Sequence, residues 1–93
     1  MIRNSDLIIT ARNKGRLIGI AGSVTDFVYC TYLSDLAVDQ EFQNKGIGGK
    51  LIKLTKNETP TAKVILLSAP KAVDYYPDIG LTKHKACFYF DGE

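Results

Sequence analysis

A glycine-rich turn between a strand-like segment and a helical segment is the feature that most constrains this chain. The strand-like apolar run ends at Val38, and apolar residues at helical spacing begin at Ile47. Three glycines fall in the connecting turn and the first helical turn: Gly46, Gly48 and Gly49. Each costs about 0.8–1 kcal/mol relative to alanine inside a helix, so their clustering indicates that something must approach the backbone closely.

The start of this helix is predicted to bind an anion. Unpaired amides and the positive end of the helix dipole favour negative charge there, and no carboxylate lies in residues 45–51 to occupy the position. Two phosphate motifs do not fit. A P-loop needs serine or threonine after Gly-Lys, whereas Leu51 follows Gly49-Lys50; the dinucleotide fingerprint has glycine where Leu51 stands.

The segment Gln43-Asn44-Lys45-Gly46-Ile47-Gly48 has the form Q/R-x-x-G-x-G/A. It resembles the acyl-CoA pyrophosphate loop of the Gcn5-related N-acetyltransferase (GNAT) family. The resemblance implies that residues of this loop and its flanks bind the cofactor. They are Leu36, Ala37, Val38, Gln43, Asn44, Lys45, Gly46, Ile47, Gly48, Gly49 and Lys50.

A second motif strengthens the resemblance. The family pattern N-x-x-A-x-x-f-Y-x-x-x-G-F is matched in register by Ala72, Tyr76 and Gly80, while Ala69 and Leu81 replace its asparagine and final phenylalanine. Ala69 therefore offers no polar contact to the pantetheine arm of the cofactor.

The resemblance implies acetyl transfer from acetyl-CoA to an amine of a small molecule or peptide. Tyr76 matches the tyrosine that protonates the departing thiolate in many relatives, and a phenol retains its proton at neutral pH. Asp35 lies near positions where relatives place an acidic residue and is the candidate base. The alternatives are that Tyr76 only packs beside Tyr75, that Asp35 is a solvated carboxylate, and that the chain is a CoA-binding module without activity.

Composition agrees with one soluble domain over residues 1–93. Hydrophobic residues make up 45% of the chain and charged residues 24%, and the net charge is +2 without basic clusters. We therefore expect no nucleic-acid partner, no membrane segment and a cytoplasmic location. Cys30 and Cys87 are expected to be buried, reduced thiols, and His84 alone indicates no metal site.

The predicted fold class is α+β: a mixed, mainly antiparallel sheet with one parallel β-α-β crossover and two helices. The expected elements are antiparallel strands at residues 7–11, 16–25 and 28–38, a helix at 46–56, a parallel strand at 64–68 buried on both faces, a helix at 71–76 and a last strand at 85–90. The longer helix should bury Ile47, Leu51 and Leu54 and be closed by Asn57 and Pro60. Relative to the family, the first strand and two helices are expected to be missing, and a homodimer is expected to cover that flank.

Overall fold

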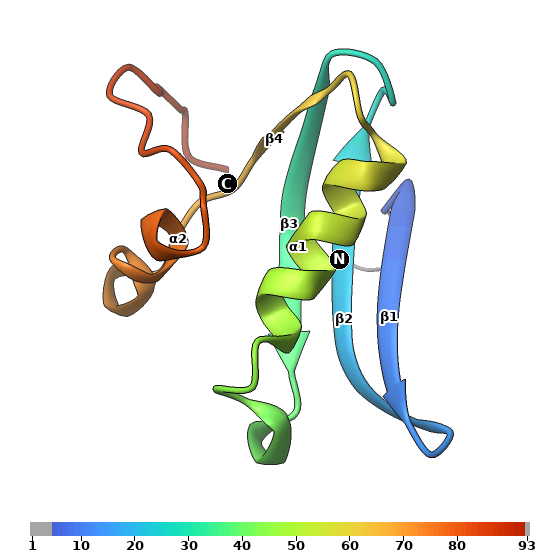
Figure 1. The fold of residues 1–93 in the computed structure, drawn as a ribbon. Helices are drawn as coiled ribbons and strands as arrows, with labels where there is room; N and C mark the ends of the chain where they lie inside the picture. The colour runs from blue at the N-terminus through green and yellow to red at the C-terminus, as the bar shows by residue number, and fades with distance from the viewer. Residues whose placement is uncertain (1–4, 93) are drawn as a thin grey trace.

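Four strands form one mixed sheet in the computed structural model, which describes residues 5–92 (Figure 1). The sheet order follows the sequence, with antiparallel pairing throughout except between the last two strands, which are parallel. This confirms the predicted meander and crossover. The strands are β1 (Leu7–Asn13), β2 (Arg16–Thr25), β3 (Cys30–Val38) and β4 (Lys63–Ile65).

Both hairpin turns have a local chemical cause. Between β1 and β2, Lys14 and Gly15 adopt positive φ angles of 52° and 82°, which suit a tight hairpin. Between β2 and β3, the Asp26 carboxylate accepts hydrogen bonds from the N–H groups of Val28, Tyr29 and Cys30. These donors stabilise the ionised form and hold the pKa of Asp26 below its ordinary value.

Helix α1 (Ile47–Glu58) packs on one face of the sheet and closes the core. Leu51 and Ile52 meet Ala21 of β2 and Leu33 of β3 in a buried apolar cluster.

Two details of the predicted helix were wrong. Leu54 is 47% exposed, while Thr55 is fully buried. Successive helical residues are about 100° apart, so a helix that directs Thr55 inward turns Leu54 towards solvent. Asn57 lies inside the helix, and Thr59 caps it through an N–H bond to the Lys56 carbonyl.

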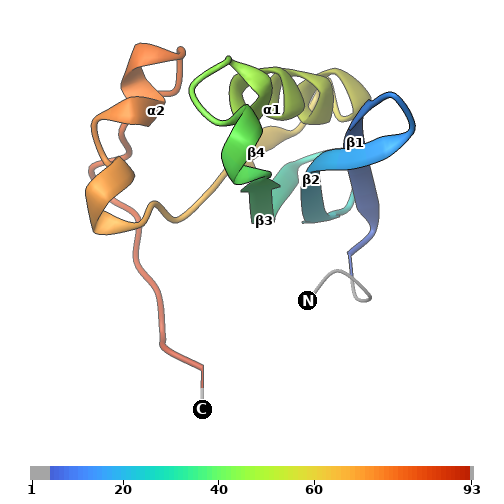
Figure 2. The same ribbon diagram turned by 90° about the horizontal axis from the view of Figure 1, so that it is seen from below.

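The opposite face of the sheet carries no helix among the described residues, because α1 and the short helix α2 (Tyr75–Asp78) lie on the same side (Figure 2). Ile8, Val24 and Ile65 remain substantially exposed. The prediction that the parallel strand is buried on both faces was therefore wrong, and β4 is shorter than expected.

The C-terminal third differs most from expectation. The predicted helix at 71–76 is replaced by a 3-10 turn, η3 (Pro70–Ala72), and the short helix α2 (Tyr75–Asp78). Residues 85–90 form no strand: in the described chain the only strand paired with β4 is β3. Cys30 and Cys87 are exposed, not buried: Cys30 is the first residue of β3, and Cys87 lies outside any helix or strand.

Candidate functional site

Strands β3 and β4 separate part-way along β3. They pair only from Cys30 with Lys63 to Tyr32 with Ile65, and β3 then continues to Val38 paired with β2 alone. The register between β2 and β3 shifts near this point, leaving Ser34 as the extra residue of a bulge. A bulge bends its strand, and Figure 1 shows the chain after β4 running away from β3. Within residues 5–92, the β4-side edge of residues 33–38 is thus left without a strand partner.

The loop after β3 presents the bare start of α1. Gly46 is the N-cap residue, with a left-handed φ of 81°, and Asn44 has φ 65°. No side chain caps the helix, and its first turn contains no acidic residue. The first four N–H groups of a helix have no partner within it, so this end has free donors and a positive dipole end.

Side chains of the loop hold it against the end of β3. The Gln43 Nε2 donates a hydrogen bond to the Val38 carbonyl at 3.0 Å. Asp39 accepts from the Glu41 N–H, which caps the 3-10 turn η2 (Gln40–Phe42), and it pairs with Arg16 at 2.7 Å. Contacts within the chain itself therefore support the shape of the loop.

The end of β3, the loop, the start of α1 and α2 enclose a cavity of about 570 Å³. Eight of the predicted site residues line it: Leu36, Val38, Gln43, Asn44, Gly46, Ile47, Gly48 and Tyr76. Lys45, Gly49 and Lys50 belong to the same loop and helix turn but do not line the cavity; Lys45 lies over the Phe42 ring, 5.3 Å from its centroid.

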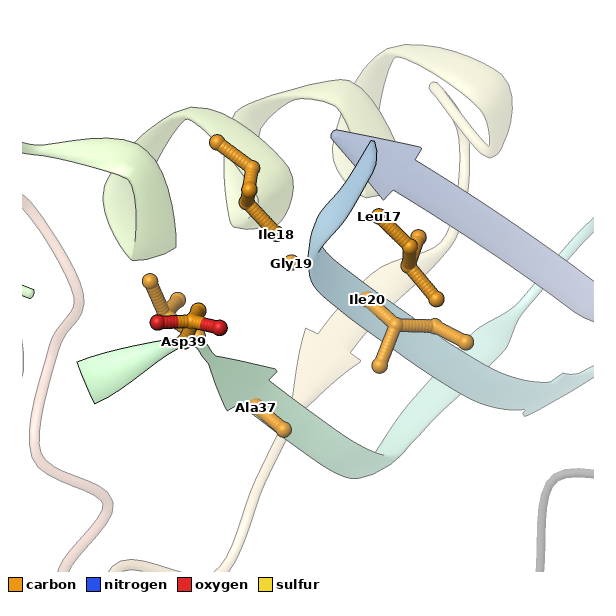
Figure 3. Close-up of a pocket in the computed structure, with 7 residues that line it drawn as sticks. Leu17, Ile18, Gly19, Ile20, Ala37 and Asp39 are labelled. Carbon is orange, nitrogen blue, oxygen red and sulfur yellow. The ribbon is translucent and has the colours of Figure 1, made fainter. Parts of the chain in front are cut away.

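Asp35 and Ala37 are not brought into this cavity. They pair with Gly22 and Ile20, whereas the intervening Leu36 pairs with Ala21 of the core, so alternation directs Asp35 and Ala37 to the uncovered face. Ala37 lines a separate hollow of about 260 Å³ there (Figure 3).

Tyr76 and Tyr75 play different parts in the walls. Tyr76 is partly buried against the core, and its ring meets that of Tyr75 edge-on, with centroids 5.3 Å apart. Tyr75 reaches across to α1: a Cβ built on Gly48 would lie 3.6 Å from the Tyr75 hydroxyl.

Sequence reasoning missed four cavity residues, namely Phe42, Ala72, Tyr75 and Ile79. The signal was weak: Ala72 and Tyr75 occupy positions of the second motif, but no pattern indicates which aromatic faces the helix.

Comparison with protein families agrees with this geometry. The sequence model of the acetyltransferase (GNAT) domain matches residues 1–93. The chain belongs to the GNAT acetyltransferase family. No curated protein matches the sequence.

Solved structures share the GNAT fold. A Deinococcus radiodurans R1 protein, provisionally described as an acetyltransferase, superposes with a TM-score of 0.80 at 22% identity, over 95% of this chain and 63% of its own. A GNAT family protein of Streptococcus pneumoniae TIGR4 gives 0.77 at 24%, over 96% and 74%. An acetyltransferase of Bacillus anthracis str. Ames, provisionally assigned to streptothricin and in complex with acetyl coenzyme A, gives 0.71 at 21%, over 82% and 47%. This GNAT chain thus spans less than two thirds of the Deinococcus and Bacillus proteins.

Within residues 5–92 of this GNAT domain, no group of three or more His, Cys, Asp or Glu side chains is placed to hold a metal ion. None of the described helices is long and apolar enough to cross a membrane.

Proposed function

We propose that the cavity binds acetyl-CoA and that the domain transfers the acetyl group to an amine. The observation that carries the proposal is the uncapped start of α1, which forms one wall of a cavity whose other wall holds Tyr76. Its free N–H groups suit the pyrophosphate, because a helix start combines donors with a positive dipole end. The acetyl-CoA complex of the Bacillus protein, which shares this fold, supports the choice of cofactor.

The pantetheine arm would follow the β4-side edge of β3. This edge lacks a strand partner along residues 33–38, and Leu36 and Val38 line the cavity from it. An amide-containing chain there can complete the hydrogen bonding that β4 leaves open, as an added strand would. That path leads from the start of α1 towards the Ser34 bulge.

The proposed reaction is direct attack of a neutral amine on the thioester carbonyl. A C–N bond forms, the C–S bond breaks, and the thiolate leaves with the electron pair. Tyr76, which lines the cavity, donates a proton to that sulfur as general acid. The amine supplies the proton that the base removes, so acetyl amide and CoA thiol are the products.

Asp35 is proposed as the base, acting through water. Its side chain lies on the uncovered face, next to the bulge at Ser34, whose Oγ is 3.5 Å from the Asp35 Oδ2. The amine would therefore approach from the side of the sheet opposite α1, through the gap where β3 and β4 diverge. A negative carboxylate at this entrance also favours a cationic acceptor.

The uncovered face and the outer edge of β1 support a homodimer in which a second copy covers this side and contributes to the acceptor cleft. β1 is an edge strand, and Ile8 and Val24 are exposed beside it. Exposed edges and apolar patches are commonly covered by association. The free, exposed Cys30 and Cys87 fit a reducing compartment, which supports a cytoplasmic location.

Calorimetric titration with CoA, followed by a thiol-release assay with acetyl-CoA and a panel of amines, tests the proposal. We expect saturable CoA binding and amine-dependent release of thiol. Binding without turnover of any amine would favour the non-catalytic module, and absence of CoA binding would refute the assignment of the cavity.

A further inference from the structure

The Tyr75 side chain lines the cavity and reaches from α2 to the first turn of α1. It belongs to α2, lines the cavity, and places its hydroxyl 3.6 Å and 3.8 Å from Cβ atoms built on Gly48 and Gly49. These are the positions at which α1 has no side-chain cap and no acidic residue. The phenol therefore lies close to the helical turn whose backbone donors are unpaired.

The groups at the start of α1 and the Tyr75 hydroxyl favour an anion that accepts several hydrogen bonds. The backbone N–H groups are donors, the helix start is the positive end of the dipole, and the phenol can donate as well as accept; the described first turn contributes no acceptor side chain. A phosphate oxygen satisfies such a set, whereas an apolar group or a cation does not.

We propose that Tyr75 donates a hydrogen bond to the pyrophosphate of bound CoA and thereby clamps α2 onto the start of α1. The inference rests on the proposed function and adds to it a binding residue outside the glycine loop. Helix α2 has only four residues and is joined to β4 through the 3-10 turn η3, and besides Tyr75 the Ile79 side chain, directly after α2, lies near Gly49. A hydrogen bond from Tyr75 to the pyrophosphate would add a further attachment of α2 to α1. Cofactor binding would then order the wall that carries Tyr76.

The adjacent residues Tyr75 and Tyr76 thus have different roles: Tyr75 binds the pyrophosphate, and Tyr76 acts as the general acid. The ring of Tyr76 packs against the core, whereas Tyr75 is 42% exposed and directs its hydroxyl to α1. Tyr75→Phe keeps the ring and its edge-on contact with Tyr76, so the fold should survive the change. Tyr29→Phe is the matched control, because it removes the same atom from a 79% exposed residue at the opposite end of β3.

The test compares the affinities of wild type, Tyr75→Phe and Tyr29→Phe for CoA and for pantetheine, which lacks the pyrophosphate. We expect Tyr75→Phe to lower CoA affinity by about tenfold or more, the scale of a lost hydrogen bond to a charged group. Its affinity for pantetheine and its unfolding midpoint without ligand should match wild type, and Tyr29→Phe should bind both ligands normally.

The outcomes separate this inference from the proposed function. Wild-type CoA affinity in Tyr75→Phe would overturn the role of Tyr75 while leaving the cofactor site intact. An equal loss for CoA and pantetheine, or a lowered unfolding midpoint, would show that Tyr75 acts by packing α2 and not on the pyrophosphate. Failure of wild type to bind CoA would refute the proposed function itself.

Discussion

Gly48→Val separates the role of the glycine loop in binding from its role in folding. Gly48 is inside α1, and a Cβ on it would meet only the Tyr75 hydroxyl at 3.6 Å and the Val38 Cγ2 at 3.9 Å, both ordinary contacts. The additional valine methyls would extend from this position into the cavity that Gly48 lines. The substitution should therefore obstruct the cofactor while sparing the core.

The expected magnitudes differ between the two properties. Valine is a slightly better helix former than glycine, so the free energy of unfolding should change by less than about 0.5 kcal/mol. Overpacking of a filled site typically costs about 1–3 kcal/mol, which corresponds to a loss of roughly 5- to 150-fold in CoA affinity. Thermal unfolding without ligand measures the first quantity, and calorimetric titration with CoA measures the second.

Gly48→Ala is the matched control. Its single Cβ fits without a close contact, so CoA affinity should stay near that of wild type. The unfolding midpoint should rise by about 3–8 °C, because alanine gains up to about 1 kcal/mol over glycine in a helix and a domain of this size shifts by about 4–8 °C per kcal/mol. A folded Gly48→Val variant with wild-type CoA affinity would refute the assignment of the cavity.

Three further predictions concern the acid, the β2–β3 turn and the assembly. Tyr76→Phe should lower kcat roughly ten- to a thousandfold with little change in CoA affinity, as thiol-release kinetics would show; unchanged turnover would leave Tyr76 as a packing residue. The pKa of Asp26 is lowered in the folded state, so its charge stabilises the fold at pH values above the unfolded-state pKa of about 3.9. This contribution is lost as the pH falls through the lower folded-state pKa. Asp26→Asn should therefore be less stable than wild type in thermal unfolding at pH 7 and approach it as the pH falls through the lowered folded-state pKa, whereas a difference independent of pH would contradict an electrostatic role. Sedimentation equilibrium at micromolar concentration should give a dimer, and a monomer with and without CoA would refute the proposed association.

The cavity illustrates how far local sequence signals reach. Two features were predicted: a glycine-rich helix start without an acidic residue, and the end of β3 at Val38. Each depends only on a few neighbouring residues. Which residues line the cavity was predicted only in part. Asp35 and Ala37 belong to the predicted set but lie on the other face, since the pleat of β3 and the bulge at Ser34 decide their direction.

The errors concentrate where the outcome depends on partners distant in sequence. The apolar spacing of α1 is compatible with more than one buried face, and contact with β2 and β3 selected the one that leaves Leu54 exposed. The segment at residues 85–90 has strand-like composition, yet a strand requires a hydrogen-bonding neighbour, and in the described structure it has none.

By itself the sequence determined the antiparallel meander, the glycine-rich start of α1 and membership of an acetyltransferase family, because turn residues, periodicity and motif spacing act over short stretches of chain. Only the tertiary structure decided that β3 and β4 separate after Tyr32, that one face of the sheet stays uncovered, and that Tyr75 reaches α1. Those features arise from the register of strands and the packing of side chains that are far apart in the chain, which local pattern does not encode.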